Sequence, residues 1–286
     1  VVVVGNITAG GTGKSPLTAM LAKMLVQEGW QPVILTRGYG GKSRRYPLLV
    51  APETPASEAG DEPVMLSAQA GCPVVVDPDR RSAALWALDQ GLGNLLLCDD
   101  GLQHYRLPRD IEIAVLDYQR GFGNGALIPV GPLREGIRRL QSVDFVITNG
   151  GLLRDLEHPR QYEMRLHPTV IRNLSTGQTM SPEVLAGKAV MAVAGIGNPR
   201  RFFETLKSLG AQVTERPLAD HHRFSSRDLD CDQPGQWLVM TAKDAVKCRE
   251  LAPRNAWVLD IEARLSPEFC KAFVGAVNTG FKTGEI

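Results

Sequence analysis

The chain opens on a short apolar run and then changes its period. Residues 1–4 are consecutive valines, the pattern of a strand that is buried on both faces of a parallel sheet. After residue 14 the apolar positions recur three and four residues apart, which predicts a helix; they are Leu17, Met20, Leu21, Met24 and Leu25. The glycine-rich stretch between the two is expected to form a tight turn.

The same alternation of strand and helix continues through the first half of the chain. Apolar runs predict further strands at residues 32–36, 73–76, 94–98, 111–117 and 143–148. Helical patterns separate these runs, and such an order is typical of a parallel sheet covered by helices. We therefore expect an α/β fold with a mostly parallel sheet in this part.

The pattern changes after residue 154. Residues 162–166 and 170–174 could pair as a β-hairpin around residues 167–169, which contain a proline. From residue 181 a second, smaller α/β unit is expected, with strands at 189–194 and 237–240. The predicted division is a first domain over 1–155, a β-hairpin connector over 156–180 and a C-terminal α/β domain over 181–286.

The turn after the first strand has the layout of a phosphate-binding P-loop. Strand, glycine loop, Lys14-Ser15 and helix follow one another, so the first domain is expected to be P-loop NTPase-like. Lys14 would reach the β- and γ-phosphates of ATP, and the Ser15 hydroxyl would join an Mg²⁺ shell. The backbone N–H groups of the loop would surround the phosphates at Thr8, Ala9, Gly10, Gly11, Thr12 and Gly13.

The match to the P-loop pattern is imperfect. The strict pattern requires glycine where the chain has Thr8. The sequence fits a variant loop with paired glycines, in which a lysine normally stands at the position of Ala9. The alternative is a glycine-rich turn that binds no ligand.

Two aspartates follow the apolar run at residues 94–98. An all-apolar strand that ends in Asp99 and Asp100 is the Walker B arrangement, which places carboxylates opposite a P-loop at the carboxyl edge of the sheet. Hard oxygen ligands suit Mg²⁺, which takes only one or two protein carboxylates. The alternative is a strand that ends in an Asp-Gly turn.

Other polar or glycine-rich stretches allow two interpretations each. Arg37 begins a glycine loop that suits a phosphate or is a plain turn. Asp61 lies at an expected helix start, which by itself favours a local structural role over a carboxylate in a cleft. His221 and its neighbour His222 lie in a loop, where histidines are usually surface residues. The apolar side chains of loop 121–135 could cover a cleft or meet an acyl chain or a membrane surface.

The composition argues against several classes of protein. A formal net charge of +1 argues against a dedicated nucleic-acid binder. The five cysteines are odd in number and show no C-x-x-C spacing, which indicates a reducing compartment and no structural zinc. No run of about 18 apolar residues predicts a membrane span. The first residue is not Met and lies within a strand, so residues upstream are expected to have been removed.

The chain resembles the tetraacyldisaccharide 4′-kinase family, the lipid A 4′-kinases of Gram-negative bacteria. The resemblance covers essentially the whole chain and rests on motifs in the same order, at residues 5–16, 37–41, 60–63, 99–104, 131–135, 220–221 and 241–247. It implies transfer of the ATP γ-phosphate to the 4′-hydroxyl of an acylated glucosamine disaccharide-1-phosphate. The expected place is the cytoplasmic face of the bacterial inner membrane.

The resemblance also assigns roles to residues. Asp61 and His221 would form the catalytic dyad, with Lys14 as a further catalytic residue. Ser15, Asp99 and Asp100 would be the metal residues, with Glu135 as another carboxylate near the metal. Asp61 thereby takes a catalytic role that its local pattern did not favour.

The sequence departs from the family in two places. Members begin with an apolar segment that helps to hold them on the membrane, and this chain starts after it. Ala242 stands where glutamate is common. The expected partners are the acylated lipid and the inner-membrane surface, without nucleic acid, and a monomer is the expected state.

Two other functions remain possible from the residues. One is a variant-loop ATPase switch that dimerises over ATP, against which Ala9 argues. The other is a P-loop kinase or synthetase that acts on a soluble small molecule. The apolar loop and the arginines beside it favour an amphipathic, anionic substrate instead.

Overall fold

The computed structural model describes residues 1–280 of the protein. Its strands form one mixed sheet in the order β11-β10-β12-β13-β8-β7-β6-β1-β5-β2-β4-β3, and β9 pairs with β8 beside this path. The strands are β1 (Val2–Gly5), β2 (Pro32–Thr36), β3 (Leu48–Leu49), β4 (Val74–Val76), β5 (Leu95–Asp99), β6 (Ile111–Asp117), β7 (Phe145–Asn149), β8 (Gln161–Asn173), β9 (Thr179–Met180), β10 (Ala189–Ala194), β11 (Gln212–Pro217), β12 (Trp237–Thr241) and β13 (Ala256–Leu265).

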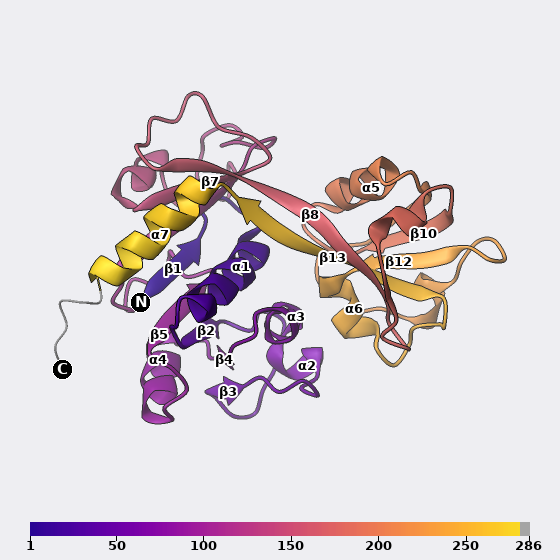
Figure 1. The fold of residues 1–286 in the computed structure, drawn as a ribbon, viewed down its shortest axis with the longest axis horizontal. Coiled ribbons are helices and arrows are strands. Elements are labelled where there is room, and N and C mark those ends of the chain that lie inside the picture. Colours follow the sequence, from indigo (N-terminus) through magenta and orange to yellow (C-terminus); the bar gives the residue numbers. More distant parts are fainter. Residues whose placement is uncertain (281–286) are drawn as a thin grey trace.

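Helices cover both faces of this sheet (Figure 1). The α-helices are α1 (Lys14–Gln27), α2 (Ala56–Ala59), α3 (Asp61–Gln69), α4 (Arg80–Asp89), α5 (Pro199–Ser208), α6 (Ala242–Cys248) and α7 (Pro267–Gly280). Short 3₁₀ helices lie at Ile137–Ser142, Pro182–Leu185 and Ser226–Leu229. The prediction of an α/β fold with a mostly parallel sheet flanked by helices is confirmed.

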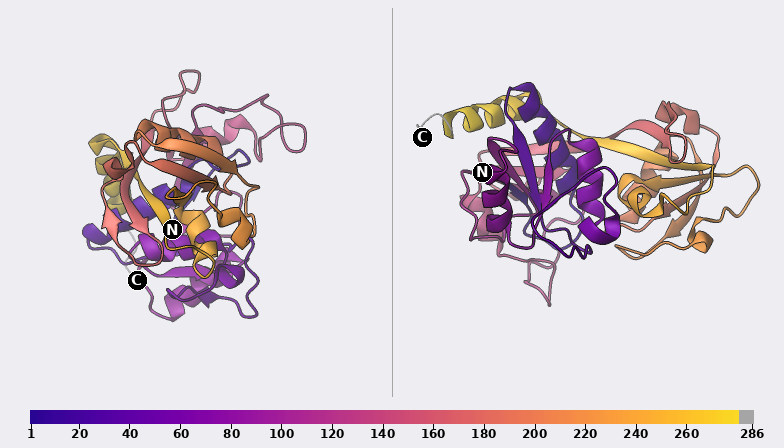
Figure 2. Two further views of the ribbon diagram at one scale, coloured as in Figure 1. Left: turned by 90° about the vertical axis from the view of Figure 1, so that its right-hand side faces the viewer. Right: turned by 90° about the horizontal axis from the view of Figure 1, so that it is seen from below.

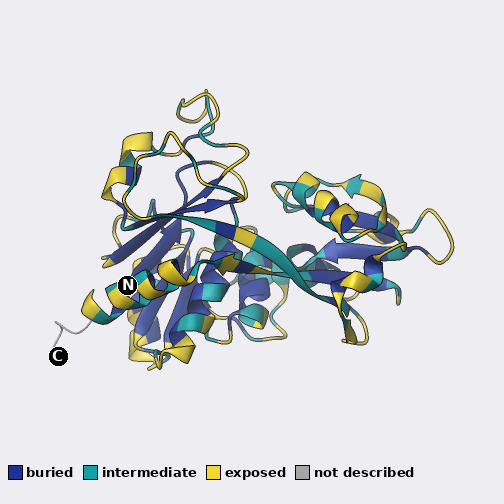
Figure 3. Ribbon diagram, turned by 45° about the horizontal axis from the view of Figure 1, so that its top comes forward, coloured by how far each residue is buried: buried dark blue, intermediate teal, exposed yellow. Residues whose placement is uncertain are grey.

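The central strands are buried along their whole length. Every residue of β1, β2, β4, β5, β6 and β7 is buried, as Figure 3 shows. One face packs under α1, α3 and α7, and the other under α4 and the neighbouring loops. This burial on both faces is why these strands appear in the sequence as continuous apolar runs.

The predicted hairpin around residues 167–169 is wrong. Residues 161–173 form the single strand β8, which pairs antiparallel with β13 over nearly its whole length. The register shifts opposite Asp260 and Ile261, so Thr169 is an extra residue beside Pro168. A proline has no N–H to donate, and it is tolerated at such an irregularity in a strand.

Two long strands therefore join the two parts of the sheet. Figures 1 and 2 show β8 and β13 side by side, running from the P-loop-bearing part to the part that contains β10, β11 and β12. After β13 the chain returns to the first part, where Phe269, Phe273 and Val277 of α7 lie in its core. The assignment of the whole segment after residue 181 to the smaller domain is therefore wrong for α7, because this helix buries its apolar face against the first sheet.

Candidate active site

Glycines shape the loop between β1 and α1. Gly10 and Gly13 have φ values of +92° and +96°, which side-chain-bearing residues rarely adopt. A Cβ on Gly13 would also approach Asn149 Nδ2 to 2.8 Å. The loop thus needs glycine both for its backbone conformation and for the close approach of β7.

Two polar side chains and one backbone hydrogen bond hold the loop. Asn149 Nδ2 donates to the carbonyl of Thr12 at 3.0 Å, and Arg120 donates to the carbonyl of Gly11. The N–H of Ala9 donates to the carbonyl of Pro132 at 2.7 Å. The first two bonds use carbonyl oxygens of the loop, whereas the third uses the N–H of Ala9. The N–H groups at Gly10–Gly13 and the N-terminus of α1 face the anion site.

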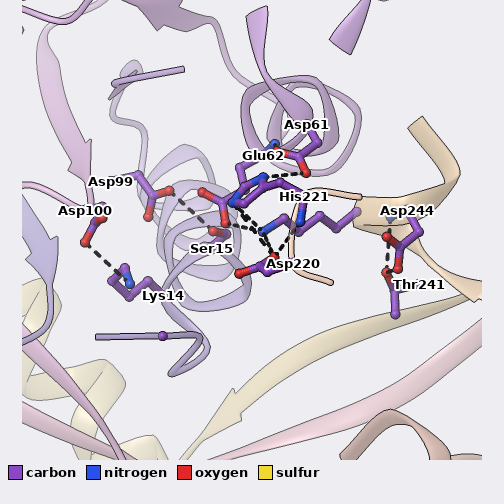
Figure 4. A network of polar contacts seen from close by, with 12 residues as sticks. Lys14, Ser15, Asp61, Glu62, Asp99, Asp100, Asp220, His221, Thr241 and Asp244 are labelled. Atoms are coloured by element: carbon purple, nitrogen blue, oxygen red, sulfur yellow. Dashed lines mark hydrogen bonds and ion pairs between the residues drawn. The ribbon is translucent and has the colours of Figure 1, made fainter. Parts of the chain in front are cut away.

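The two aspartates at the end of β5 have different surroundings (Figure 4). Asp99 is 1% exposed and accepts hydrogen bonds from Thr18 at 2.8 Å and from Ser15 at 3.4 Å. Burial, together with the negative charges of Glu62 and Asp100, raises the pKa of Asp99 to about 7. Within residues 1–280 Asp99 is therefore a buried carboxylate that forms no ion pair, although the charge of Lys14 opposes the effect of burial.

Asp100 instead faces cations. It adopts a φ of +50° and lies 3.4 Å from Lys14 Nζ and 3.2 Å from Arg134 Nη1. Burial by itself would raise the pKa of Asp100, but the charges of Lys14 and Arg134 hold it below its usual value.

The donor set beside the P-loop fits a hydrated magnesium ion. Within residues 1–280 no group of three or more His, Cys, Asp or Glu side chains is arranged to hold a metal. The Ser15 hydroxyl and the Asp99 carboxylate nevertheless lie together, and the raised pKa of Asp99 marks uncompensated negative charge there. Mg²⁺ commonly takes one or two protein oxygens and completes its shell from phosphates and water.

Glu135 lies apart from this pair. It accepts hydrogen bonds from Gln103 Nε2 at 2.6 Å and from the Tyr105 hydroxyl, and Arg139 lies 3.5 Å away. The structure does not bring it into contact with Ser15 or either aspartate. Its metal role stays a prediction, and its observed contacts are those of a residue that anchors the loop carrying Arg134.

Asp61 and His221 meet across the two parts of the molecule. Asp61 is the first residue of α3 and is 4% exposed, and its Oδ2 lies 3.0 Å from His221 Nδ1. His221 has a φ of +59°, and its ring packs at 4.7 Å on that of Tyr39. Figure 4 shows the two side chains pointing toward each other over the P-loop helix.

The contact changes the proton affinity of both groups. The hydrogen bond to Asp61 raises the pKa of His221, although burial opposes this. Burial would raise the pKa of Asp61, but the hydrogen bond from His221 and the charge of Lys243 hold it below its usual value. The pair therefore favours an ionised carboxylate beside a protonated imidazole.

Two lysines of α6 complete the network. The sequence analysis included them in the motif at residues 241–247 but assigned neither of them to the site. Lys243 Nζ lies 3.0 Å from Glu62, 3.2 Å from Asp220 and 3.5 Å from His221 Nε2. Lys247 Nζ lies 3.7 Å from Asp61. The two lysines are four residues apart, so they lie on one face of α6. This spacing, directly after a strand end, is the feature of the sequence that could have indicated them.

A buried aspartate anchors the start of α6. Asp244 accepts hydrogen bonds from the N–H of Gly195 at 3.1 Å and from the Thr241 hydroxyl at 2.7 Å, and Lys247 lies 3.0 Å away. It therefore ties the carboxyl ends of β10 and β12 to the helix that carries both lysines.

His222 does not join the network. It lies 3.2 Å from Asp228 and packs edge-on against Phe224. The neighbouring histidines therefore point to different surroundings.

One cavity of about 1540 Å³ connects these groups. It is lined by the P-loop, Asp100, His221 and Lys243, and by Leu127 and Ile128 of loop 121–135. The two parts touch beside it: a Cβ on Gly197 would come within 2.9 Å of Gly11 N, and Arg201 lies 3.2 Å from Asp117. A phosphate site and a polarised histidine thus open into the same space.

Known proteins share this chain's sequence and fold. Residues 1–278 match the family model described as tetraacyldisaccharide-1-P 4′-kinase. A protein of Vibrio cholerae (strain ATCC 39541) named tetraacyldisaccharide 4′-kinase is 48% identical over 270 residues, which covers 94% of this chain and 78% of the relative. A protein of Tolumonas auensis with the same name is 46% identical over 270 residues and is covered to 80%.

A solved structure is also similar. The crystal structure of LpxK from Aquifex aeolicus in complex with ATP superposes with a TM-score of 0.81 at 27% identity. The match covers 98% of this chain and 88% of that one.

Proposed function

The chain belongs to the tetraacyldisaccharide 4′-kinase family, and on this premise we propose that it is an ATP-dependent kinase of lipid A biosynthesis. It transfers the γ-phosphate of ATP to the 4′-hydroxyl of a tetraacylated glucosamine disaccharide-1-phosphate. The observation that supports this most directly is the single cavity that joins the P-loop to His221.

The nucleotide phosphates bind at the P-loop. Residues 8–13 and the start of α1 surround the phosphates. The N–H of Ala9 already donates to Pro132, so the other loop N–H groups contact the phosphates, and Lys14 neutralises charge on the transferred group. Asp100 and Arg134 hold the Lys14 side chain in this region through their shared ion pairs. Because the transition state is loose, positioning and charge stabilisation supply most of the catalysis.

Ser15 and Asp99 are the residues that would hold Mg²⁺. When bound, the ion neutralises charge on the β- and γ-phosphates. Thr18 donates to the second oxygen of Asp99 and so orients the carboxylate. The Asp100 carboxylate already forms ion pairs with Lys14 and Arg134, so we do not assign it to the ion.

Asp61 and His221 act on the acceptor hydroxyl. His221 in its neutral form takes the proton of the 4′-hydroxyl as that oxygen attacks the γ-phosphorus and the bond from phosphorus to the leaving ADP breaks. Asp61 accepts the hydrogen bond of Nδ1–H, orients the ring and stabilises the imidazolium that forms. Lys243 lies beside His221 in the same part of the molecule, and Lys247 lies beside Asp61 across the cleft. Since Asp61 and His221 come from different parts of the molecule, closure of the cleft would assemble this half of the site.

The acceptor reaches the site from a membrane surface. Leu127 and Ile128 line the cavity and are each 53% exposed, and Val130 beside them is 77% exposed. Such side chains suit acyl chains at the cytoplasmic face of the inner membrane. Within residues 1–280 no helix is long and apolar enough to cross a bilayer.

An acceptor series tests the function. We expect ATP consumption to depend on the tetraacyl disaccharide-1-phosphate in mixed micelles and to yield a 4′-phosphorylated product. Equal ATP hydrolysis without any acceptor would favour the ATPase switch. Transfer to water-soluble sugars in preference to the lipid would favour a kinase of soluble small molecules.

The aspartates should differ in their effect on Mg²⁺. Asp99→Asn should weaken Mg²⁺ binding about 10- to 100-fold, because it removes the charged ligand beside Ser15. Asp100→Asn should change Mg²⁺ binding less and phosphate binding more, because Asp100 positions Lys14. Calorimetric titration of Mg²⁺ into the nucleotide complex measures this, and equal Mg²⁺ affinities in the wild type and the Asp99 variant would contradict it.

A further inference from the structure

A buried carboxylate at the end of β6 contacts both parts of the molecule. Asp117 is the last residue of β6 and is 2% exposed. Its Oδ1 accepts a hydrogen bond from the N–H of Arg120 at 3.1 Å, whereas its Oδ2 lies 3.2 Å from Arg201 Nη2. Arg201 belongs to α5, in the other part of the molecule. One oxygen of this carboxylate therefore holds a turn of the first part, and the other oxygen holds a helix of the second.

The Arg120 side chain lies against the glycines of the P-loop. Its guanidinium donates to the carbonyl of Gly11, and a Cβ on Gly10 would approach Arg120 Nη1 to 2.6 Å. Because a trans peptide points its carbonyl and its N–H in opposite directions, this bond turns the N–H of Thr12 away from Arg120. Such an orientation of successive N–H groups is what an anion site in a loop requires.

The neighbouring strand holds the next peptide of the loop. Asn149 ends β7 and is the register partner of Asp117 across β6 and β7. Its Nδ2 donates to the carbonyl of Thr12 at 3.0 Å. Two consecutive P-loop peptides are thus held from the ends of two adjacent strands, one directly by Asn149 and the other by Arg120, whose backbone Asp117 fixes.

The second part of the molecule reaches the same place. Gly197 lies shortly before α5, and a Cβ on it would come within 2.9 Å of Gly11 N. Arg201 is the third residue of α5, lines the cavity and has a side chain that is 25% exposed. Gly11 is therefore approached at its nitrogen by Gly197 and at its carbonyl by Arg120, and Asp117 connects Arg120 to the helix that follows Gly197.

The charge of Asp117 depends on both arginines. Within residues 1–280 its ion pairs are the one with Arg201 at 3.2 Å and a longer one with Arg120 Nε at 3.9 Å. A buried carboxylate is costly when a partner is removed. Without Arg201, the carboxylate would attract the Arg120 guanidinium more closely and draw it from the carbonyl of Gly11.

We propose that Asp117 is a positioning residue for the phosphate site, which couples the docking of α5 to the orientation of the P-loop at Gly11. The inference rests on the proposed function, since its effect is on phosphoryl transfer from ATP. Asp117 acts only through Arg120 and Arg201, because its own side chain does not line the cavity. With Arg201 in place, Arg120 keeps the Gly11 carbonyl turned outward, and the loop N–H groups stay directed at the phosphates.

Asp117→Asn and Arg201→Gln test this coupling. Each should lower kcat/KM for ATP about 5- to 100-fold, whereas KM for the lipid acceptor should change by less than about twofold. The double variant should be little worse than the more damaging single variant, because both substitutions remove the same ion pair. Arg201→Lys, which keeps the charge, should recover part of the loss. A merely structural role would lower the melting temperature without these kinetic changes.

Arg200→Gln is the matched control. Arg200 precedes Arg201 on α5, but its side chain is 86% exposed, pairs with Glu204 at 2.7 Å and does not line the cavity. Its substitution should leave all kinetic constants unchanged. If Asp117→Asn does not fold, Arg120→Gln and Arg201→Gln decide, because both side chains are partly exposed. Their effects should again be less than multiplicative, since both act through Asp117.

Three results would overturn the inference. They are a wild-type kcat/KM for ATP in Arg201→Gln, effects of Asp117→Asn and Arg201→Gln that multiply, and an equal loss in Arg200→Gln. If the wild type binds ATP but phosphorylates no lipid, the proposed function fails by itself. Calorimetric titration with ATP then tests the coupling alone: weaker binding by Arg201→Gln but not by Arg200→Gln supports it, and equal binding by all three proteins overturns it.

Discussion

Lys14→Ala is expected to lower kcat at least about 10²–10³-fold. Preorganised donors aimed at developing charge contribute on this scale, and Lys14 is the cation that opens the P-loop helix. The fold should persist, because Asp100 keeps its ion pair with Arg134 at 3.2 Å after the lysine is removed. Steady-state rates, together with the melting temperature, check both statements.

A lysine on the same helix provides the control. Lys23 forms an exposed ion pair with Glu262 at 2.6 Å, and neither residue lines the cavity. Exposed pairs contribute only about 0–1 kcal/mol, so Lys23→Ala should leave both activity and folding nearly unchanged. Activity near the wild-type value in Lys14→Ala would remove the P-loop from the mechanism.

Asp61→Ala and His221→Ala should each lower kcat about 10²–10⁴-fold, with a smaller change in KM for ATP. The two groups share one hydrogen bond of 3.0 Å and act on one proton. Removing both should therefore be little worse than removing the more damaging one alone. Kinetics of the two single variants and the double variant measure this non-additivity.

His222→Ala is the matched control, because its ring contacts Asp228 and Phe224 instead. Should it match His221→Ala in its effect, or should the Asp61 and His221 effects multiply, the dyad would be rejected. Asp61 would then be only the first residue of a helix.

The Asp61–His221 pair should also make the stability of the fold depend on pH. The raised pKa of His221 stabilises the fold below the unfolded value of about 6.5, and this contribution is lost as pH rises through the folded value. The lowered pKa of Asp61 stabilises it above the unfolded value near 3.8 and is lost on acidification through the folded value. The difference in melting temperature between wild type and His221→Ala should thus be larger near pH 6 than at pH 9.

The sequence by itself predicted those features whose residues lie close together in the chain. The strands of the first part are buried on both faces, so their apolar runs were visible without a structure. The P-loop lies within residues 5–15, and strand, glycines, lysine and hydroxyl appear there in one short stretch. Asp99 and Asp100, at the end of β5, could be placed opposite the P-loop because parallel strands end at one edge of the sheet.

The tertiary structure alone decided what meets across that edge. His221 and Asp61 are 160 residues apart, and no local period brings them together; only the family resemblance had paired them. Glu135 contacts Gln103 and Tyr105 and not the predicted metal residues. The hairpin expected at residues 167–169 is part of one long strand in the structure. The buried Nε of Arg80, which has no hydrogen-bond partner within residues 1–280, also appeared only in three dimensions, because its surroundings depend on what the other elements pack beside it. A sequence shows which groups are available, whereas their partners depend on how the elements pack.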